Sequence, residues 1–394
     1  MDFRDTPEQA RWRNEVRSFL DAELAPDWRG GGDEEAMFGT GRREVITAWR
    51  KKLAARGWIA PAWPKEYGGA SMSIMEQFIF NEEVAKAQAP PNDMIGVGMV
   101  GPTLIVYGTE EQKKEHLGGI LSGERWWCQL YSEPGAGSDL ASLQTRAVRD
   151  GDDYVVNGQK IWTSGAHIAD YGILLARTDP TAPKHKGISY FMVDMKSPGI
   201  TVRPLVNMAD NHSFNEVFFE DVRVPKKNMI GEENRGWYMA VTTLDFERSA
   251  IGGNVGMRRQ IDELIAFAKE ARADGRSTLD ANPSLRYELA DRVVEAEVAK
   301  MMSYRIVTMQ DRGLIPNHEA SCAKLFSSEL SQRVAATGMH VLGLYGQISP
   351  KSKWAPLRGR IERSYLGAVS ATIAGGTSEI QRNIIAQRGL GMPR

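Results

Sequence analysis

The chain has 394 residues, with 49 Lys and Arg against 50 Asp and Glu, which gives a formal net charge of −1. No block of like charge stands out, so neither nucleic acid nor an anionic membrane surface is an obvious partner. The 2 cysteines, Cys128 and Cys322, are far apart in sequence, as is typical of reduced thiols. The N-terminal segment is charged and helical in spacing, and no run of 18 apolar residues occurs, so we predict a cytoplasmic protein without a signal peptide or a membrane span.

The spacing of apolar residues changes twice along the chain. Helical spacing dominates from Asp5 to about Ser122, for example at residues 7–24 and 73–87. Long helical patterns return after residue 233, for example at residues 284–312 and 320–343.

Between these helical parts, residues from about 123 to 233 form short β-branched and aromatic runs separated by turn signals. Asp150-Gly151 and Asn157-Gly158 flank one of these runs, which predicts a hairpin turn on each side of it. We therefore predict a mostly helical fold with a central β unit. Its expected parts are an N-terminal helical domain (1–122), a middle antiparallel β domain (123–233) and a C-terminal helix bundle (234–394).

Two common kinds of site are not supported by the motifs. The segment GVGMVG, Gly96 to Gly101, has the dinucleotide-binding spacing but follows no strand and precedes Pro102, so close helix packing or a loop explains it better. The 6 histidines have no metal-ligand spacing, and we expect no metal.

The segment CQLYSEPGAGSDL, residues 128–140, carries a Gly-Ala-Gly loop bracketed by Ser132, Glu133, Ser138 and Asp139. Its backbone N–H groups and hydroxyls suit a pyrophosphate or a ring carbonyl, although a polar turn between strands explains the composition equally well. Downstream, Trp162 stands beside Thr163 and Ser164 at a strand end, where an indole can lie against a planar cofactor.

Near the C-terminus, Gly375 and Gly376 precede a Ser378–Gln381 pair spaced as a capping box. This spacing predicts a helix from Ser378 to Gly389. The paired glycines also clear side-chain volume from whatever faces the start of that helix.

Several motifs in order, from about residue 5 to 394, resemble the acyl-CoA dehydrogenase family. They include WPKEYGG, YSEPGAGSD, NGQKIWTSGAHIADYGILLARTD, FEDVRVPKKNMIGEENRGW and GGTSEIQRNIIAQRGLG. The resemblance implies bound FAD, oxidation of an acyl-CoA thioester to the trans-2-enoyl-CoA, and transfer of electrons to an electron-transferring flavoprotein. The positions it implies at the cofactor are Tyr131, Ser132, Gly137, Ser138, Trp162, Thr163, Ser164, Gly376, Thr377 and Ser378. Those it implies at the substrate are Ser138, Leu244, Arg248 and Gly375.

The reaction needs a carboxylate to take the α-proton while the β-hydride goes to flavin N5, and such a base works best when burial raises its pKa toward roughly 6–7. The family's most frequent base is a Glu immediately before Gly-Thr-Ser, and Gly375 occupies that place here. Its second location, in an LxxERxxxxGG context, reads LDFERSAIGG here and contains Glu247.

At helical spacing, Glu247 shares a stripe with the apolar residues Ala240 and Leu244, whereas Asp245 lies off that stripe. Taken alone, Glu247 is better explained by a surface ion pair with Arg248 than by catalysis. The Gly at the usual place decides for the catalytic interpretation. We predict that Glu247 is the base and that Gly375 leaves room for it, as in family members that act on branched, long-chain or steroid side-chain acyl-CoAs.

Two segments depart from the family pattern. In most members, an RxxFG segment and a QxxGGxG segment hold the outer half of FAD across a subunit interface. Here the key places of the first segment are occupied by Ala271 and Asp274. Those of the second are occupied by His340, Leu344 and Tyr345. Either a homotetramer holds FAD by other contacts, or a different polypeptide completes the pocket, as in bacterial α2β2 enzymes for CoA-activated steroid side chains.

Other readings are a flavin monooxygenase or oxidase on the same scaffold and a non-catalytic partner subunit. Glu247 argues against the first of these, and the intact loop and Trp-Thr-Ser motifs argue against the second.

Overall fold

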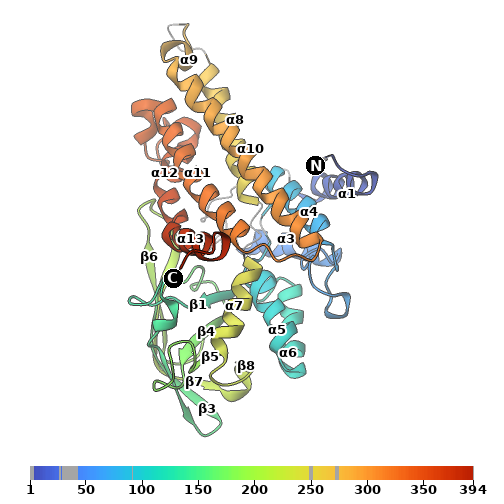
Figure 1. Cartoon of the computed structure of the whole chain (residues 1–394), viewed down its shortest axis with the longest axis vertical. Helices are drawn as coiled ribbons and strands as arrows, with labels where there is room; N and C mark the ends of the chain where they lie inside the picture. The colour runs from blue at the N-terminus through green and yellow to red at the C-terminus, as the bar shows by residue number, and fades with distance from the viewer. Residues whose placement is uncertain are drawn as a thin grey trace. The chain divides into compact units, whose positions relative to one another are not determined.

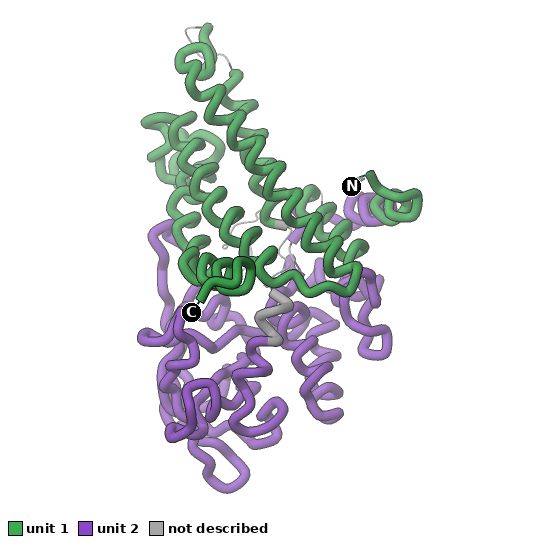
Figure 2. Tube along the Cα trace, in the orientation of Figure 1, with its two compact units in different colours: residues 1–13, 74–87, 249–394 green, residues 14–73, 88–248 purple. Residues whose placement is uncertain are grey.

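The computed structural model describes residues 4–25, 28, 43–90, 92–247, 252–270 and 275–393, apart from the side chains of 242–247 and 252. These residues form two compact units (Figure 2). Unit 1 comprises residues 1–13, 74–87 and 249–394, and unit 2 comprises residues 14–73 and 88–248. Along the chain, helices precede and follow one sheet (Figure 1), which confirms the predicted fold class.

Unit 2 is built on an eight-stranded sheet with the order β6-β7-β3-β2-β4-β5-β8, in which β1 also pairs with β4. The strands are β1 (Trp127–Leu130), β2 (Arg146–Asp150), β3 (Asp153–Lys160), β4 (Tyr171–Arg177), β5 (Ile188–Asp194), β6 (Ile200–Val206), β7 (His212–Pro225) and β8 (Met229–Ile230). Alternate side chains of these strands form a buried core that includes Leu130, Tyr154, Leu174, Phe191 and Val217. Alternate side chains of a strand point to the same face, so this core lies on one face of the sheet; β4 and β5 are buried on their other face as well.

The sheet is mixed rather than purely antiparallel, which corrects the prediction. β4 pairs in parallel with β1 and, at one residue, with β2, whereas the other pairings are antiparallel. A parallel pair needs a crossover connection, and the chain between β1 and β4 supplies one because it contains the whole β2–β3 hairpin.

One of the two predicted hairpin turns is correct. Gly151, with φ +63°, lies between β2 and β3 at the Asp150-Gly151 position. Asn157-Gly158 instead lies inside β3 at an irregularity in its pairing with β7. A Cβ on Gly158 would stand 2.5 Å from Oγ1 of Thr145, so this glycine permits a close approach between β3 and the residue before β2 rather than a reversal of the chain.

The helices of unit 2 are α3 (Arg43–Ala55), α5 (Gly101–Tyr107), α6 (Glu110–Leu121), α7 (Gly236–Glu247) and most of α1 (Pro7–Glu23). α7 packs against β5 and α5. The GVGMVG segment forms a π-helical turn over Gly96–Val100 that leads into α5. A Cβ on Gly101 would overlap the ring of Trp63, so the expected close packing is confirmed.

Unit 1 is a helix bundle with α10 and α11 as its longest members (Figure 1). Its helices are α4 (Ile74–Lys86), α8 (Gly252–Lys269), α9 (Thr278–Ala281), α10 (Ser284–Asp311), α11 (His318–Leu342), α12 (Arg360–Ala371) and α13 (Ser378–Ile384). Contacts join α10 to α4, α8 and α11, and α11 to α12 and α13. Buried apolar residues such as Ile261, Leu264, Leu289, Leu330 and Val334 form its core.

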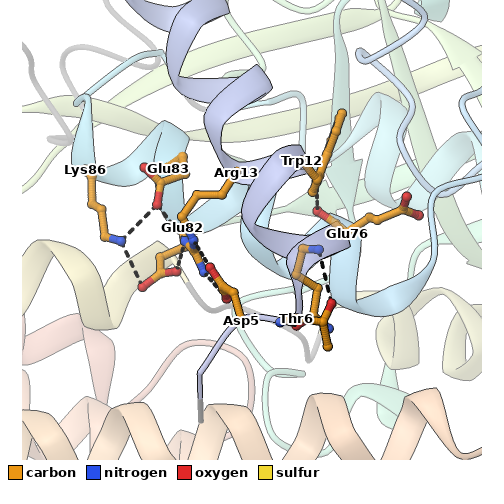
Figure 3. Close-up of polar contacts among 9 residues, drawn as sticks. Asp5, Thr6, Trp12, Arg13, Glu76, Glu82, Glu83 and Lys86 are labelled. Carbon is orange, nitrogen blue, oxygen red and sulfur yellow. Dashed lines mark hydrogen bonds and ion pairs between the residues drawn. The ribbon is translucent and has the colours of Figure 1, made fainter.

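An ion-pair network holds the N-terminal residues of unit 1 against α4 (Figure 3). The Arg13 guanidinium lies 2.6 Å from Oε2 of Glu82, 2.6 Å from Oε1 of Glu83 and 2.7 Å from Oδ2 of Asp5. Both glutamates are buried, and the half-exposed Lys86 pairs with both of them. The hydrogen bond to Asp5 raises the pKa of Arg13 further, although burial opposes this. Arg13 therefore neutralises carboxylates that have little contact with water.

Candidate active site

The loop after β1 carries one group of predicted cofactor residues. Ser138 and Gly137 are exposed, and a Cβ on Gly137 would meet no atom within 4 Å, so the loop surface is open there. Ser132 is half-buried, and its carbonyl oxygen accepts a hydrogen bond from the Ile161 N–H at 2.9 Å. The Tyr131 ring is buried, with its hydroxyl 2.6 Å from that of Tyr190.

The second group, Trp162–Ser164, follows directly after β3. Trp162 has a left-handed φ of +59°, and its side chain is 60% exposed, which is unusual for an indole. Thr163 is fully buried. Its N–H donates to the Asn215 carbonyl oxygen and its carbonyl oxygen accepts from the Asn215 side-chain amide, but its hydroxyl has no partner among the residues that the structure describes. Ser164 is half-buried beside it. A large apolar ring on the surface next to an unsatisfied hydroxyl is typical of a ligand site.

Glu133 and Asp139, which bracket the loop, have structural partners. The Glu133 carboxylate is buried against Lys160, and Asp139 pairs with Lys184 at the surface. Sequence reasoning did not identify Lys160, although its place in the alternation of β3 indicates it. Lys160 has the same parity as Tyr154 and Val156, and all three side chains are buried.

In unit 1, the predicted glycine pair forms a left-handed turn, with φ +64° at Gly375 and +89° at Gly376. A Cβ on Gly375 would meet only Cε of Lys324, at 4.0 Å, so the side-chain position is open. Lys324 Nζ donates to the carbonyl oxygen of Gly376 at 2.7 Å, and Gln381 Nε2 donates to that of Gly375 at 3.1 Å. These two side chains hold both glycine carbonyls of the turn.

The predicted cap of the last helix is wrong by one residue. Thr377 is the N-cap of α13, and its Oγ1 accepts from the Ile380 N–H at 3.2 Å. The Gln381 side-chain amide donates to the carbonyl oxygens of Gly375 and Gly376, whereas in a capping box its oxygen would accept from the N–H of the capping residue. Ser378 is buried, and its hydroxyl has no partner within the described part of the chain. α13 ends at Ile384, and a π-helical turn continues from Ile385 to Gly389, so helical structure ends where it was predicted.

Some predicted residues lie outside the described part. The backbone of α7 includes Leu244 and Glu247, but their side chains are not among those described, and neither is any part of Arg248. Ala240, on the predicted stripe of this helix, is 1% exposed. Ala271 and Asp274 also lie outside the described residues.

The other departures from the family pattern lie on unit 1. Nδ1 of His340 lies 2.9 Å from Oε1 of Glu288, which also accepts a hydrogen bond from the Thr337 hydroxyl. Leu344 is 85% exposed and Tyr345 is 64% exposed. His340 therefore links α11 to α10, and Leu344 and Tyr345, just beyond the end of α11, present apolar surface.

No helix in the described ranges is long and apolar enough to cross a membrane. Within the same ranges, no group of three or more His, Cys, Asp or Glu side chains has an arrangement able to hold a metal ion.

Comparison with known proteins identifies the family. The models for the N-terminal, middle and C-terminal domains of acyl-CoA dehydrogenase match residues 6–124, 128–222 and 234–390. The chain belongs to the acyl-CoA dehydrogenase family. Acyl-CoA dehydrogenase FadE26 of Mycobacterium tuberculosis is 39% identical over 399 residues, which cover 99% of this chain and 98% of that relative.

Two solved structures resemble the chain along its whole length. The Tcur3481-Tcur3483 steroid ACAD is 38% identical, with a TM-score of 0.89 and 100% of each chain covered. The ChsE4-ChsE5 complex from Mycobacterium tuberculosis is 39% identical, with a TM-score of 0.86 and 100% of each chain covered. This agreement over the full chain makes the protein an enzyme of the acyl-CoA dehydrogenase class.

Proposed function

We propose that this acyl-CoA dehydrogenase oxidises a branched or bulky acyl-CoA, such as a steroid side-chain thioester, to the trans-2-enoyl-CoA with Glu247 as the base. The observation that carries the proposal is the open left-handed turn at Gly375, where the family's most frequent base would stand. Glu247 lies at the family's alternative location, near the end of α7. A chain with neither residue able to act as base would not fit the class.

The residues of unit 2 fit a bound FAD. The exposed Trp162 ring offers a face for the isoalloxazine, the unpartnered Thr163 hydroxyl is able to bond a ring heteroatom, and the open loop at Gly137 and Ser138 is able to approach phosphate. When bound, FAD supplies the two-electron acceptor for the hydride that leaves the β-carbon. We propose that an electron-transferring flavoprotein takes the electrons afterwards.

The Glu247 carboxylate accepts the α-proton as the hydride leaves the β-carbon with its electron pair. The electrons of the broken α-C–H bond then form the new C=C bond. Hydrogen-bond donors near the thioester oxygen lower the cost of the charge that develops there. The left-handed turn at Gly375–Gly376 carries no side chain at the sequence position of the family's most frequent base, and Lys324 and Gln381 hold its carbonyls.

The test is a panel of acyl-CoAs mixed anaerobically with the purified protein. We expect bulky branched and steroid side-chain thioesters to bleach the flavin absorbance at least tenfold faster than straight-chain butyryl-CoA or palmitoyl-CoA, and reoxidation in air to be slow. Fast reoxidation by oxygen would indicate an oxidase or monooxygenase instead. Equal rates across the panel would contradict the proposed substrate class while leaving the reaction class in place.

Exposed apolar side chains on unit 1 favour a heteromeric α2β2 assembly, in which a second polypeptide completes the outer part of the FAD site. These side chains are Leu344 (85%), Tyr345 (64%), Trp354 (74%), Tyr365 (47%), Val369 (46%) and Ile373 (60%). The last three recur at every fourth position along α12 and just beyond it, which is the spacing of a helix face that packs against another surface. Two solved relatives are named as two-component proteins.

Expression of the chain alone tests this assembly. We expect well under one FAD per chain, together with self-association through the uncovered surface, and recovery of flavin when a complementary acyl-CoA dehydrogenase-like subunit is co-expressed. The measurements are the flavin-to-protein absorbance ratio and the mass by light scattering. A homotetramer with one FAD per chain would rule out the heteromer.

A further inference from the structure

Lys160 is a fully buried cation at the last residue of β3, and it belongs to neither predicted group of site residues. Its Nζ lies 2.8 Å from Oε1 of Glu133 and 3.0 Å from the carbonyl oxygen of Tyr131. The Lys160 side chain is 0% exposed and that of Glu133 is 7% exposed. Burying an ion pair is costly, and such pairs do not in general stabilise a fold more than apolar residues would. This pair therefore calls for a role other than stability.

The pair joins segments that are distant in sequence. Besides Lys160, the Glu133 carboxylate accepts hydrogen bonds from the backbone N–H groups of Gln144, at 2.6 Å, and Thr145, at 2.9 Å. The residue after Lys160, Ile161, donates its N–H to the Ser132 carbonyl oxygen at 2.9 Å. The loop after β1, the segment before β2 and the end of β3 thus share one buried polar centre.

This centre lies directly beside both groups of predicted cofactor residues. The carbonyl oxygens of Tyr131 and Ser132 accept hydrogen bonds from Lys160 and Ile161, and Trp162 follows two residues after Lys160. The left-handed backbone at Trp162 directs its ring to the surface, and that conformation is costly for a bulky residue unless its surroundings enforce it. The bonds at Lys160 and Ile161 fix the chain immediately before this strained residue.

Charge is essential to the arrangement. Complete burial lowers the pKa of Lys160 to about 8, although the Glu133 carboxylate opposes the shift. Burial by itself would raise the pKa of Glu133. The charge of Lys160 and the hydrogen bonds from Lys160, Thr145 and Gln144 have the larger effect, so the pKa of Glu133 lies below its usual value. Among the described residues, Arg177 on β4 also interacts electrostatically with Glu133. The ion pair is therefore intact near pH 7 and loses the charge of Lys160 as the pH rises through about 8.

We propose that Lys160 and Glu133 are positioning residues for the flavin site, which hold the Ser132 loop and Trp162 in the one arrangement that binds the planar cofactor. The inference rests on the proposed function, because it concerns the same site. It assigns the pair no contact with substrate or cofactor.

The test compares the FAD dissociation constants of Lys160→Met, Glu133→Gln and the double variant. It uses the assembly found to bind FAD above, either the chain alone or the chain co-expressed with a second subunit. The double variant leaves no unpaired buried charge, and the amide that replaces the Glu133 carboxylate keeps an oxygen for the backbone N–H groups, so this variant is the one expected to fold most like the wild type. We expect at least a tenfold weaker FAD affinity in each single variant and at least a fivefold weaker affinity in the double variant. Arg223→Met is the matched control, because Arg223 pairs at the surface with Asp150 and Asp153 on the same hairpin. It should stay within twofold of the wild type.

A pH series separates positioning from plain stability. Between pH 7 and 9, the FAD affinity of the wild type should fall at least threefold as Lys160 loses its proton, whereas that of Lys160→Met should stay flat. Far-ultraviolet circular dichroism confirms at each pH that the proteins are folded. A double variant that is folded and binds FAD like the wild type would overturn the inference, and so would a pH response that persists in Lys160→Met. A wild-type assembly that binds no flavin would contradict the proposed function itself.

Discussion

Glu247→Gln is expected to lower kcat for acyl-CoA oxidation by at least about 10²–10⁴-fold, the contribution typical of a positioned general base. The amide keeps nearly the volume of the carboxylate but is unable to accept the α-proton. FAD content and the affinity for acyl-CoA should therefore stay close to those of the wild type. The measurements are turnover with an artificial electron acceptor and the rate of anaerobic flavin bleaching in a single turnover.

Asp245→Asn is the matched control for this substitution. It removes a carboxylate from the same helix, at a position that lies off the predicted apolar stripe, so turnover should stay within about twofold of the wild type. Near-full activity in Glu247→Gln would show that another group takes the proton. Equal losses in both variants would point to a general disturbance of α7 rather than to a base.

The sequence predicted the regular elements well because they carry strong local signals. The spacing of apolar residues over 284–312 and 320–343 matches α10 (Ser284–Asp311) and α11 (His318–Leu342) within a few residues. The Asp150-Gly151 turn is also local, since two residues determine it.

Features that depend on distant partners were harder to predict. The same turn signal at Asn157-Gly158 is overridden because Thr145, on another segment, approaches the backbone of Gly158. The role of Lys160 depends on Glu133, 27 residues earlier. A lysine is rarely fully buried without a partner, so its inward position in β3 has no clear meaning until that partner is known.

In the predicted site, too, some features follow from the local sequence and others do not. Exposure of Trp162 and the open turn at Gly375 follow from backbone conformations near +60° in φ. The sequence signals such a conformation at a glycine but not at a tryptophan. The cap of α13 differs by one residue because Thr377 and Ser378 are both good caps, and local spacing does not choose between them.

Arg13→Met should lower the free energy of unfolding by about 3–5 kcal/mol, because it leaves buried carboxylates without their cation. Glu82 and Glu83 are 5% and 3% exposed, so water is unable to replace the guanidinium, and Lys86 reaches them only from the surface. The loss should appear in the unfolding of unit 1, measured by urea titration with circular dichroism on the FAD-loaded protein.

The matched control is Arg258→Met, which removes a half-exposed arginine paired with Asp262 and Glu297 in the same bundle. Such a pair contributes about 0–1 kcal/mol, because water and salt screen it. Combining Arg13→Met with Glu82→Gln and Glu83→Gln should recover at least half of the lost stability, since the destabilisation comes from unpaired charge rather than from lost packing. If the combined variant is as unstable as Arg13→Met alone, the stem of Arg13 and not its charge holds the N-terminal residues to α4.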